Sequence, residues 1–149
     1  MAFVFQSVAL ISTMTAYENV EFALRMTKLP YKERNERARQ ALVQVGLEKR
    51  MRHRPGEMSG GEQQRVAIAR AVAASPKIIF ADEPTAELDS PTGFAVMKLF
   101  KDLVRQNDLT IVMTTHDTSM MEAADIVYTL EDGVISDMTV NDTKEEPNA

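Results

Sequence analysis

The sequence predicts an α/β fold in which helices alternate with the strands of a mixed, mainly parallel sheet. Two short apolar runs, residues 77–81 and 110–115, are rich in β-branched side chains and end in polar residues, as buried parallel strands do. A helix with Ser90 as its N-cap is expected between them, and a strand, helix and strand of this length form a right-handed parallel crossover. The Asp132-Gly133 pair lies between two further apolar runs and predicts a hairpin, which adds antiparallel pairing.

The first elements of the chain precede this crossover. Residues 2–5 are expected to form a buried strand that ends at Gln6. Thr15 and Glu18 have the spacing of a capping box, which predicts the start of a helix that ends before Pro30.

Two more helices are expected before residue 77. From 32 to 45, apolar residues recur at helical spacing opposite a charged face, and Gly46 is placed to end this helix. The alanine-rich segment 63–74 continues a second helix, whose start is predicted at Ser59.

Residues 58–65 combine a flexible turn with this helix start. Ser59 is expected at the N-cap with Glu62 three residues later, and such a capping box can stabilise a helix and do nothing else. The same start also exposes the backbone N–H groups of Gly60 and Gly61 at the positive end of the helix dipole. An anion such as a phosphate can bind there without a basic side chain.

Polar residues also follow both predicted parallel strands. Asp82 and Glu83 come directly after 77–81, and His116 follows 110–115. In open α/β sheets, ligands bind at the carboxyl ends of the strands, which favours a functional site here. The alternatives are an acidic pair that only caps a turn and an ordinary turn histidine.

Four short motifs follow one another in the order typical of one family. They are Ser-Gly-Gly-Glu at 59–62, Asp82-Glu83, Leu88-Asp89 and His116. Through these motifs the chain resembles ATP-binding cassette (ABC) ATPases from residue 3 to about residue 137. The sequence of residues 59–70 is most similar to that of the lipoprotein-releasing and macrolide-export subunits. The resemblance implies a P-loop NTPase-like fold with an inserted helical subdomain, ATP and Mg²⁺ as ligands, and two partners, an integral membrane transporter subunit and a second ATP-binding subunit.

The resemblance also implies a role for each motif residue. Asp82 is expected to hold Mg²⁺, Glu83 to polarise the attacking water, and His116 to contact the γ-phosphate. Gln6 matches a glutamine that contacts the metal or the water and senses the membrane partner, with a surface glutamine as the alternative. Asp89 matches an aspartate that reaches across a dimer interface. The nucleotide-binding turn, named the signature turn below, comprises Ser59, Gly60, Gly61 and Glu62.

The sequence contains no P-loop, the Gly-x-x-x-x-Gly-Lys segment whose backbone N–H groups wrap phosphates, and none of its six glycines is followed by lysine. We therefore expect an N-terminally truncated ABC domain with unpaired strand edges that does not hydrolyse ATP alone. In the family's dimer, each ATP lies between the P-loop of one subunit and the signature turn of the other, so the chain would complete a site on an intact partner.

The expected partial ATPase domain covers 1–137. Its helical subdomain is expected at about 15–74, and the remaining core at about 1–6 and 76–137. Residues 138–149 are polar and acidic and are expected to be disordered.

The composition narrows the class of protein. With no cysteine and two histidines, a metal would be bound through oxygen ligands. A formal net charge of -5 without a basic stripe argues against nucleic acid as a ligand. No apolar run is long enough to span a bilayer and no leader is recognisable, so we expect a cytoplasmic protein, peripheral on the inner face of the cell membrane.

Our main interpretation is an ATP-binding and ATP-hydrolysing subunit of an ABC transporter that energises export or release of a lipophilic or peptide-like cargo. A first alternative is a non-catalytic module, or a split-gene half, which supplies the signature turn to a P-loop-bearing partner. A second is the head domain of a DNA-repair or chromosome-maintenance ATPase. Such proteins carry long coiled coils between the motifs, and no sustained heptad pattern is present here.

Overall fold

The computed structural model describes residues 1–141 and divides the chain into two compact units, Met1–Thr114 and a second unit that begins at Thr115. Within the described residues, no helix is both long enough and apolar enough to cross a bilayer.

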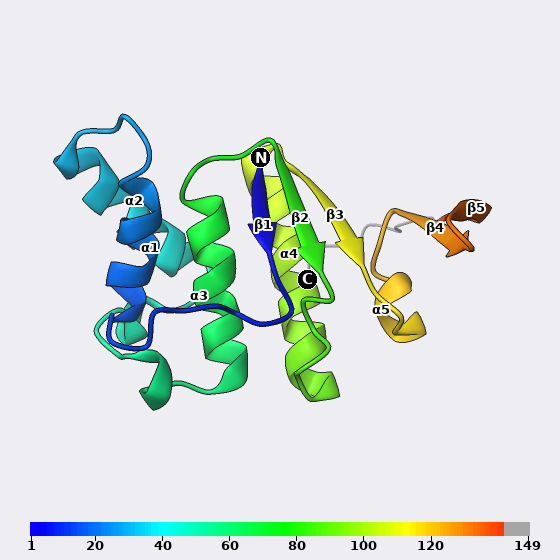
Figure 1. Cartoon of the computed structure of the whole chain (residues 1–149), viewed down its shortest axis with the longest axis horizontal. Helices are drawn as coiled ribbons and strands as arrows, with labels where there is room; N and C mark the ends of the chain where they lie inside the picture. The colour runs from blue at the N-terminus through cyan, green and yellow to red at the C-terminus, as the bar shows by residue number, and fades with distance from the viewer. Residues whose placement is uncertain (142–149) are drawn as a thin grey trace, which may run out of the picture. The chain divides into compact units, whose positions relative to one another are not determined.

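A three-stranded parallel sheet forms the centre of the first unit (Figure 1). Its strands are β1 (Ala2–Val4), β2 (Ile78–Asp82) and β3 (Thr110–Thr114), in the spatial order β1-β2-β3. The parallel pairing predicted for the apolar runs is thereby confirmed. The register places Phe3 beside Phe80, and Phe80 beside Val112, so one face of the sheet carries a row of large apolar side chains.

Two helices, α3 (Gly60–Val72) and α4 (Ser90–Asn107), pack on the sheet and on each other. Side chains alternate between the two faces of a strand, and the alternate residues Val4, Ile79 and Ala81 are at most 2% exposed. The core of the unit therefore lies between these residues and the two helices.

The first unit has a second, purely helical layer. Helices α1 (Ala16–Leu24) and α2 (Tyr31–Gln44) pack against each other and against α3. The 3₁₀ helices Glu48–Arg50 and Pro55–Glu57 lead from α2 to the start of α3. Since α3 contacts both the sheet and the helical layer, it connects the two parts of the unit.

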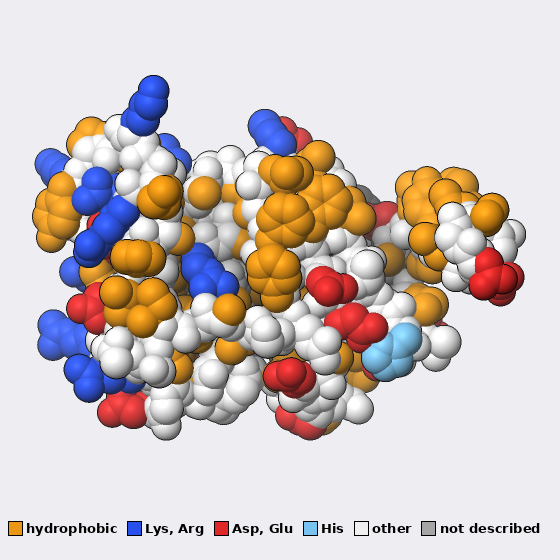
Figure 2. Space-filling model, viewed as in Figure 1, with side chains coloured by type: hydrophobic (Ala, Val, Ile, Leu, Met, Phe, Trp, Pro, Cys, Tyr) orange, Lys and Arg blue, Asp and Glu red, His pale blue; other side chains and the backbone are white. Residues whose placement is uncertain are grey.

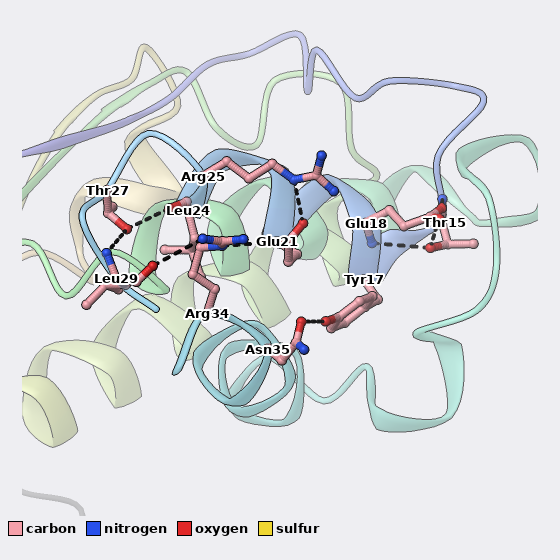
Figure 3. A network of polar contacts seen from close by, with 10 residues as sticks. All are labelled: Thr15, Tyr17, Glu18, Glu21, Leu24, Arg25, Thr27, Leu29, Arg34 and Asn35. Carbon is pink, nitrogen blue, oxygen red and sulfur yellow. Dashed lines mark hydrogen bonds and ion pairs between the residues drawn. The ribbon is translucent and has the colours of Figure 1, made fainter. Parts of the chain in front are cut away.

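A buried carboxylate ties α1 to α2 (Figure 3). Glu21 is 4% exposed and accepts hydrogen bonds from Nε of Arg25 at 2.8 Å and Nε of Arg34 at 3.0 Å. Burial raises the pKa of Glu21, but the hydrogen bonds from the two guanidinium groups outweigh it, and the net effect lowers that pKa. Nearby, the Tyr17 hydroxyl donates to the Asn35 side chain. The helical layer is thus held by directed bonds as well as by apolar packing.

The second unit contains α5 (Thr118–Met121) and a hairpin of β4 (Ile126–Glu131) and β5 (Val134–Val140). The hairpin turn at Asp132-Gly133 is confirmed, with φ of +50° and +78° at its two residues. Because the hairpin is a separate two-stranded sheet, the parallel and antiparallel pairings of the expected mixed sheet belong to two different sheets.

Two predicted boundaries need correction. Strand β5 continues to Val140 because its residues pair with β4, so the expected disordered tail at 138–149 was placed too early; residues 142–149 lie outside the described residues. The N-cap of α4 is Asp89 and not Ser90, because the Asp89 carboxylate accepts hydrogen bonds from the backbone N–H and the hydroxyl of Thr92.

Candidate functional site

The signature turn begins α3 as an open capping box. Ser59 Oγ accepts a hydrogen bond from the backbone N–H of Glu62 at 3.3 Å, and the Glu62 carboxylate accepts one from the N–H of Ser59 at 2.9 Å. Ser59 and Gly60 are exposed. The structural alternative, a helix cap, is therefore present. It uses the Ser59 oxygen as an acceptor, so the hydroxyl hydrogen is still a possible donor to a bound anion, as are the first N–H groups of the helix.

The charge of Glu62 is balanced by a neighbouring arginine. The hydrogen bond from the Ser59 backbone lowers the pKa of Glu62, and Arg50, whose Nε lies 2.9 Å from the carboxylate, lowers it further. Glu62 is thus ionised at neutral pH beside the proposed anion-binding position. An anion bound at Ser59 would lie near the Glu62–Arg50 ion pair rather than near an unpaired negative charge.

Gly61 has a packing role that the sequence did not reveal. A Cβ atom at this position would lie 2.3 Å from Cγ2 of Thr92, a separation that real side chains do not adopt. Thr92 is held in place because its hydroxyl donates to Asp89 at 2.7 Å, which lowers the pKa of Asp89. At Gly60, by contrast, a Cβ would make an ordinary contact of 3.7 Å with Leu88. The start of α3 and the 88–92 segment are therefore in direct contact within one chain.

The acidic pair at the end of β2 is fixed by the neighbouring strand. Oδ1 of Asp82 accepts a hydrogen bond from the Thr114 hydroxyl at 2.6 Å, and the backbone N–H of Glu83 donates to the Thr114 carbonyl at 3.1 Å. Glu83 has φ of +45°, in the left-handed region that non-glycine residues seldom adopt. Strain of this kind is concentrated at functional sites, where the surrounding bonds maintain it.

An arginine of α3 holds the loop that follows Gln6. Arg70 donates to the carbonyls of Ala9 at 2.9 Å and Val8 at 3.0 Å, and Ala9 has φ of +42°. Burial lowers the pKa of Arg70. One signal for this role is present in the sequence, an arginine within an otherwise alanine-rich and apolar part of the helix. Gln6 itself is exposed.

Three of the predicted motifs meet around one small cavity of about 70 Å³. Gln6 lines it from the loop after β1, Gly60 from the signature turn, and Leu88 from the segment after the acidic pair. These segments are far apart in the sequence, and the fold of the first unit brings them together.

His116 belongs to the second unit and is exposed. The next residue, Asp117, caps α5 by accepting from the backbone N–H of Ser119 at 2.9 Å and from its hydroxyl at 2.6 Å. The hydroxyl of Ser119 is the main reason that the pKa of Asp117 is lowered. The role expected for His116 at the γ-phosphate stays a prediction.

The residues expected to bind Mg²⁺ fit a particular kind of site. Within residues 1–141, no group of three or more histidine or acidic side chains is arranged to hold a metal ion. Asp82 offers one exposed carboxylate with one of its oxygens bonded to Thr114, and Gln6 offers an exposed amide. Mg²⁺ is commonly held by one or two carboxylates together with waters and substrate phosphates, so this donor set suits a metal that arrives with a nucleotide.

Comparisons with known proteins all indicate one family. A profile of the family described as ABC transporter matches residues 1–86. An uncharacterized ABC transporter ATP-binding protein of Methanocaldococcus jannaschii is 48% identical over 133 residues, which are 89% of this chain and 59% of that protein. A lipoprotein-releasing system ATP-binding protein, LolD, of Syntrophotalea carbinolica is 43% identical over 136 residues, 91% of this chain and 60% of that protein.

Solved structures show the same fold. A dimeric ATP-binding cassette, described as a post-hydrolysis state bound to ADP and Pi, matches with a TM-score of 0.77 and 41% identity over 93% of this chain and 61% of that one. The protein cbiO1 of Clostridium perfringens, part of an ABC transporter complex, has a TM-score of 0.86 and 31% identity over 92% of this chain and 55% of that one.

The chain spans about three fifths of the length of these two curated relatives. Its family profile covers more than half of its 149 residues, and the order of its motifs and its α/β architecture agree with that match. The chain belongs to the ABC transporter ATP-binding family.

Proposed function

We propose that this chain contributes the signature turn and the acidic strand end of a nucleotide site in an ABC transporter ATP-binding subunit. The observation that carries the proposal is the contact, within one chain, between the signature turn and the 88–92 segment that follows the acidic strand end. The exposed start of α3 packs through Gly60 on Leu88 and through Gly61 against Thr92, a few residues after Asp82 and Glu83.

Each motif has a chemical role in this proposal. The hydroxyl of Ser59 and the first N–H groups of α3 bind the γ-phosphate of an ATP held by a partner subunit, where the helix dipole favours negative charge. Asp82 holds Mg²⁺, which when bound neutralises phosphate charge. Glu83 accepts a proton from the attacking water, and His116 steadies the γ-phosphate. Gln6 contacts the metal or the water, and Asp89 reaches across the dimer interface.

The proposed partners are a second ATP-binding subunit and an integral membrane subunit. A dimeric cassette among the solved relatives supports the first, and the names of the curated relatives support the second. We place the chain in the cytoplasm on the inner face of the membrane. The similarity to lipoprotein-releasing subunits favours a lipophilic or peptide-like cargo, whose choice belongs to the membrane subunit.

These 149 residues contain no P-loop, and by themselves they are not expected to hydrolyse ATP. The test uses an intact, P-loop-bearing ABC subunit whose own signature serine is replaced by arginine. Adding this chain should restore Mg-ATP-dependent association and turnover. Ser59→Arg should abolish the restoration, because the new side chain would occupy the phosphate-binding position at the start of α3. Ser12→Arg places the same charge at another exposed serine and should leave the restoration intact.

Glu83→Gln separates the main proposal from its alternative. We expect slower hydrolysis with the nucleotide-bound complex still detectable, because the amide cannot accept the proton of the attacking water. Unchanged turnover with intact ATP-dependent association would instead identify a non-catalytic module that supplies only the signature turn. Full association of the Ser59→Arg chain would reject the phosphate role of the turn altogether.

A further inference from the structure

A buried side-chain amide of α3 lacks a protein partner. Gln64 is 2% exposed, and its Nε2 makes no hydrogen bond to any of the described residues. The adjacent Gln63 has the same side chain, but its Nε2 donates to the carbonyls of Pro55 at 3.0 Å and Met58 at 3.2 Å. Buried amides are nearly always hydrogen-bonded, so the difference between these two neighbours requires an explanation.

Gln64 lines the cavity of about 70 Å³ at which the motifs meet. Gln6 and Gly60 line it from the β1 loop and the signature turn, and Pro84 and Glu87 line it from the segment between the acidic pair and Asp89. The cavity is too small for a nucleotide but has room for ordered water.

The chemistry of the lining selects the occupant. The Gln64 Nε2 group is a donor, which disfavours a cation beside it. Glu87, which also lines the cavity, is exposed, and its carboxylate disfavours an anion nearby. A water molecule can accept a hydrogen bond from the amide and donate hydrogen bonds to other groups that line the cavity.

We propose that the Gln64 amide binds an ordered water in this cavity and that this water bridges α3 to the 84–88 segment and to the Gln6 loop. Gln64 is then a positioning residue. It holds the segment that follows Glu83 in a fixed relation to the helix that begins at Ser59. The water site follows from the cavity and the amide alone, whereas its consequence for ATP turnover rests on the proposed function.

The test compares the full chain with Gln64→Met and Gln63→Met. Methionine has a similar length and volume but cannot donate a hydrogen bond, so both variants should fold. A crystal structure of the unaltered chain should show a water at about 2.7–3.2 Å from Gln64 Nε2. In Gln64→Met the water should be lost, and hydrogen exchange of the backbone at 85–89 should become at least about tenfold faster, without change in the middle of α3. Gln63→Met should instead accelerate exchange at 55–58.

Gln64→Glu supplies a readout that simple core packing would not change. Only the protonated carboxyl can donate a hydrogen bond as the amide does, so protection of 85–89 should recover as the pH is lowered through the pKa of the new side chain. A pH-independent protection would overturn the bridge.

A different set of results would overturn the proposed water bridge. If Gln64 were only an unsatisfied group in the core, Gln64→Met would raise the melting temperature and leave exchange at 85–89 unchanged, and no water would lie beside the amide. These measurements need no nucleotide, so they are independent of the association tests. A chain that loses the water but still associates with ATP-loaded partner would separate the two proposals.

Discussion

The two faces of the three-stranded sheet are similarly apolar but very differently covered. On the face that packs on α3 and α4, Val4 is 1% and Ile79 0% exposed. On the other face, Phe3 is 50% and Val112 48% exposed. There the Phe3 ring stacks on the ring of Phe80 with a centroid distance of 5.5 Å. Figure 2 shows hydrophobic side chains gathered over β1 and β2 on this open face.

The strand sequences favour burial of both faces of the sheet, but the described residues of the first unit cover one face well and leave the other partly exposed. Strands with one face in water alternate apolar and polar residues, whereas parallel strands buried on both faces are apolar throughout. Strand β2 reads Ile-Ile-Phe-Ala before Asp82, which is the second pattern. The strand sequence thus favours burial on both sides, and the helices of the first unit provide it on one. We expect the stability of this unit to come mainly from the covered face.

The largest expected effect tests the two faces at neighbouring positions of one strand. Ile79→Ala should lower the free energy of unfolding by about 2–5 kcal/mol, because it leaves a cavity in the covered core. Ile78, which is 39% exposed, is the matched control, and Ile78→Ala should cost less than about 1.5 kcal/mol. Urea unfolding measures both values. Equal losses would mean that the open face is also buried in solution.

A second prediction concerns the contact between the two helices on the covered side. Gly61→Ala should destabilise the chain by about 1–3 kcal/mol, because its Cβ would overlap Thr92. Gly60→Ala adds the same methyl group with only an ordinary contact and should change stability by less than about 1 kcal/mol. Thermal unfolding of the two variants distinguishes them. Equal melting temperatures would show that α4 can move away from α3 at little cost.

On the open face we expect surface behaviour to change more than stability. Phe3→Ser removes a half-exposed ring and should cost less than about 1.5 kcal/mol. It should reduce the binding of an apolar dye and any self-association at high concentration, because it interrupts the row of exposed rings. Dye fluorescence and sedimentation velocity measure these effects. A loss of stability as large as that of Ile79→Ala would contradict the comparison.

The smallest effect is expected at the signature turn, outside both faces. The pKa of Glu62 is lowered from 4.5 in the folded chain, so its contribution to stability is present above that value and is lost as the pH falls through the lower folded pKa. The contribution should be below about 1 kcal/mol because the group is partly exposed. Glu62→Gln should remove it, and the difference between the two chains in urea midpoint should shrink from about pH 6 to about pH 3. A difference that stays constant over this range would contradict the prediction.

Features set by neighbouring residues could be predicted from the sequence. The capping boxes at Thr15 and Ser59 are both formed, and Gly46 follows α2 with φ of +73°. These depend on hydrogen bonds and backbone preferences within a few residues, which the local sequence specifies. The apolar runs gave β2 and β3 for the same reason, since their length and β-branched content are local properties.

Features set by distant residues could not be predicted. Thr114 bonds to Asp82 across 32 positions, and Arg70 holds Ala9 across 61. At the start of α4, Asp89 and Ser90 are both good caps, and the choice of Asp89 accompanies the position of Thr92 against Gly61. No local pattern marks such partners, because register and helix packing decide which side chains meet.

The sequence by itself therefore determined the family, the order of the motifs and the local start of each helix, because each is written in adjacent residues. The tertiary structure decided that Gly61 is a packing residue, that the backbone of Glu83 is held in a strained conformation by Thr114, and that Gln64, which lines a shared cavity, has a buried amide nitrogen without a partner among the described residues. The physical reason is that these features arise where α3, β2 and β3 approach one another, and the distances between elements are fixed only when the core is packed.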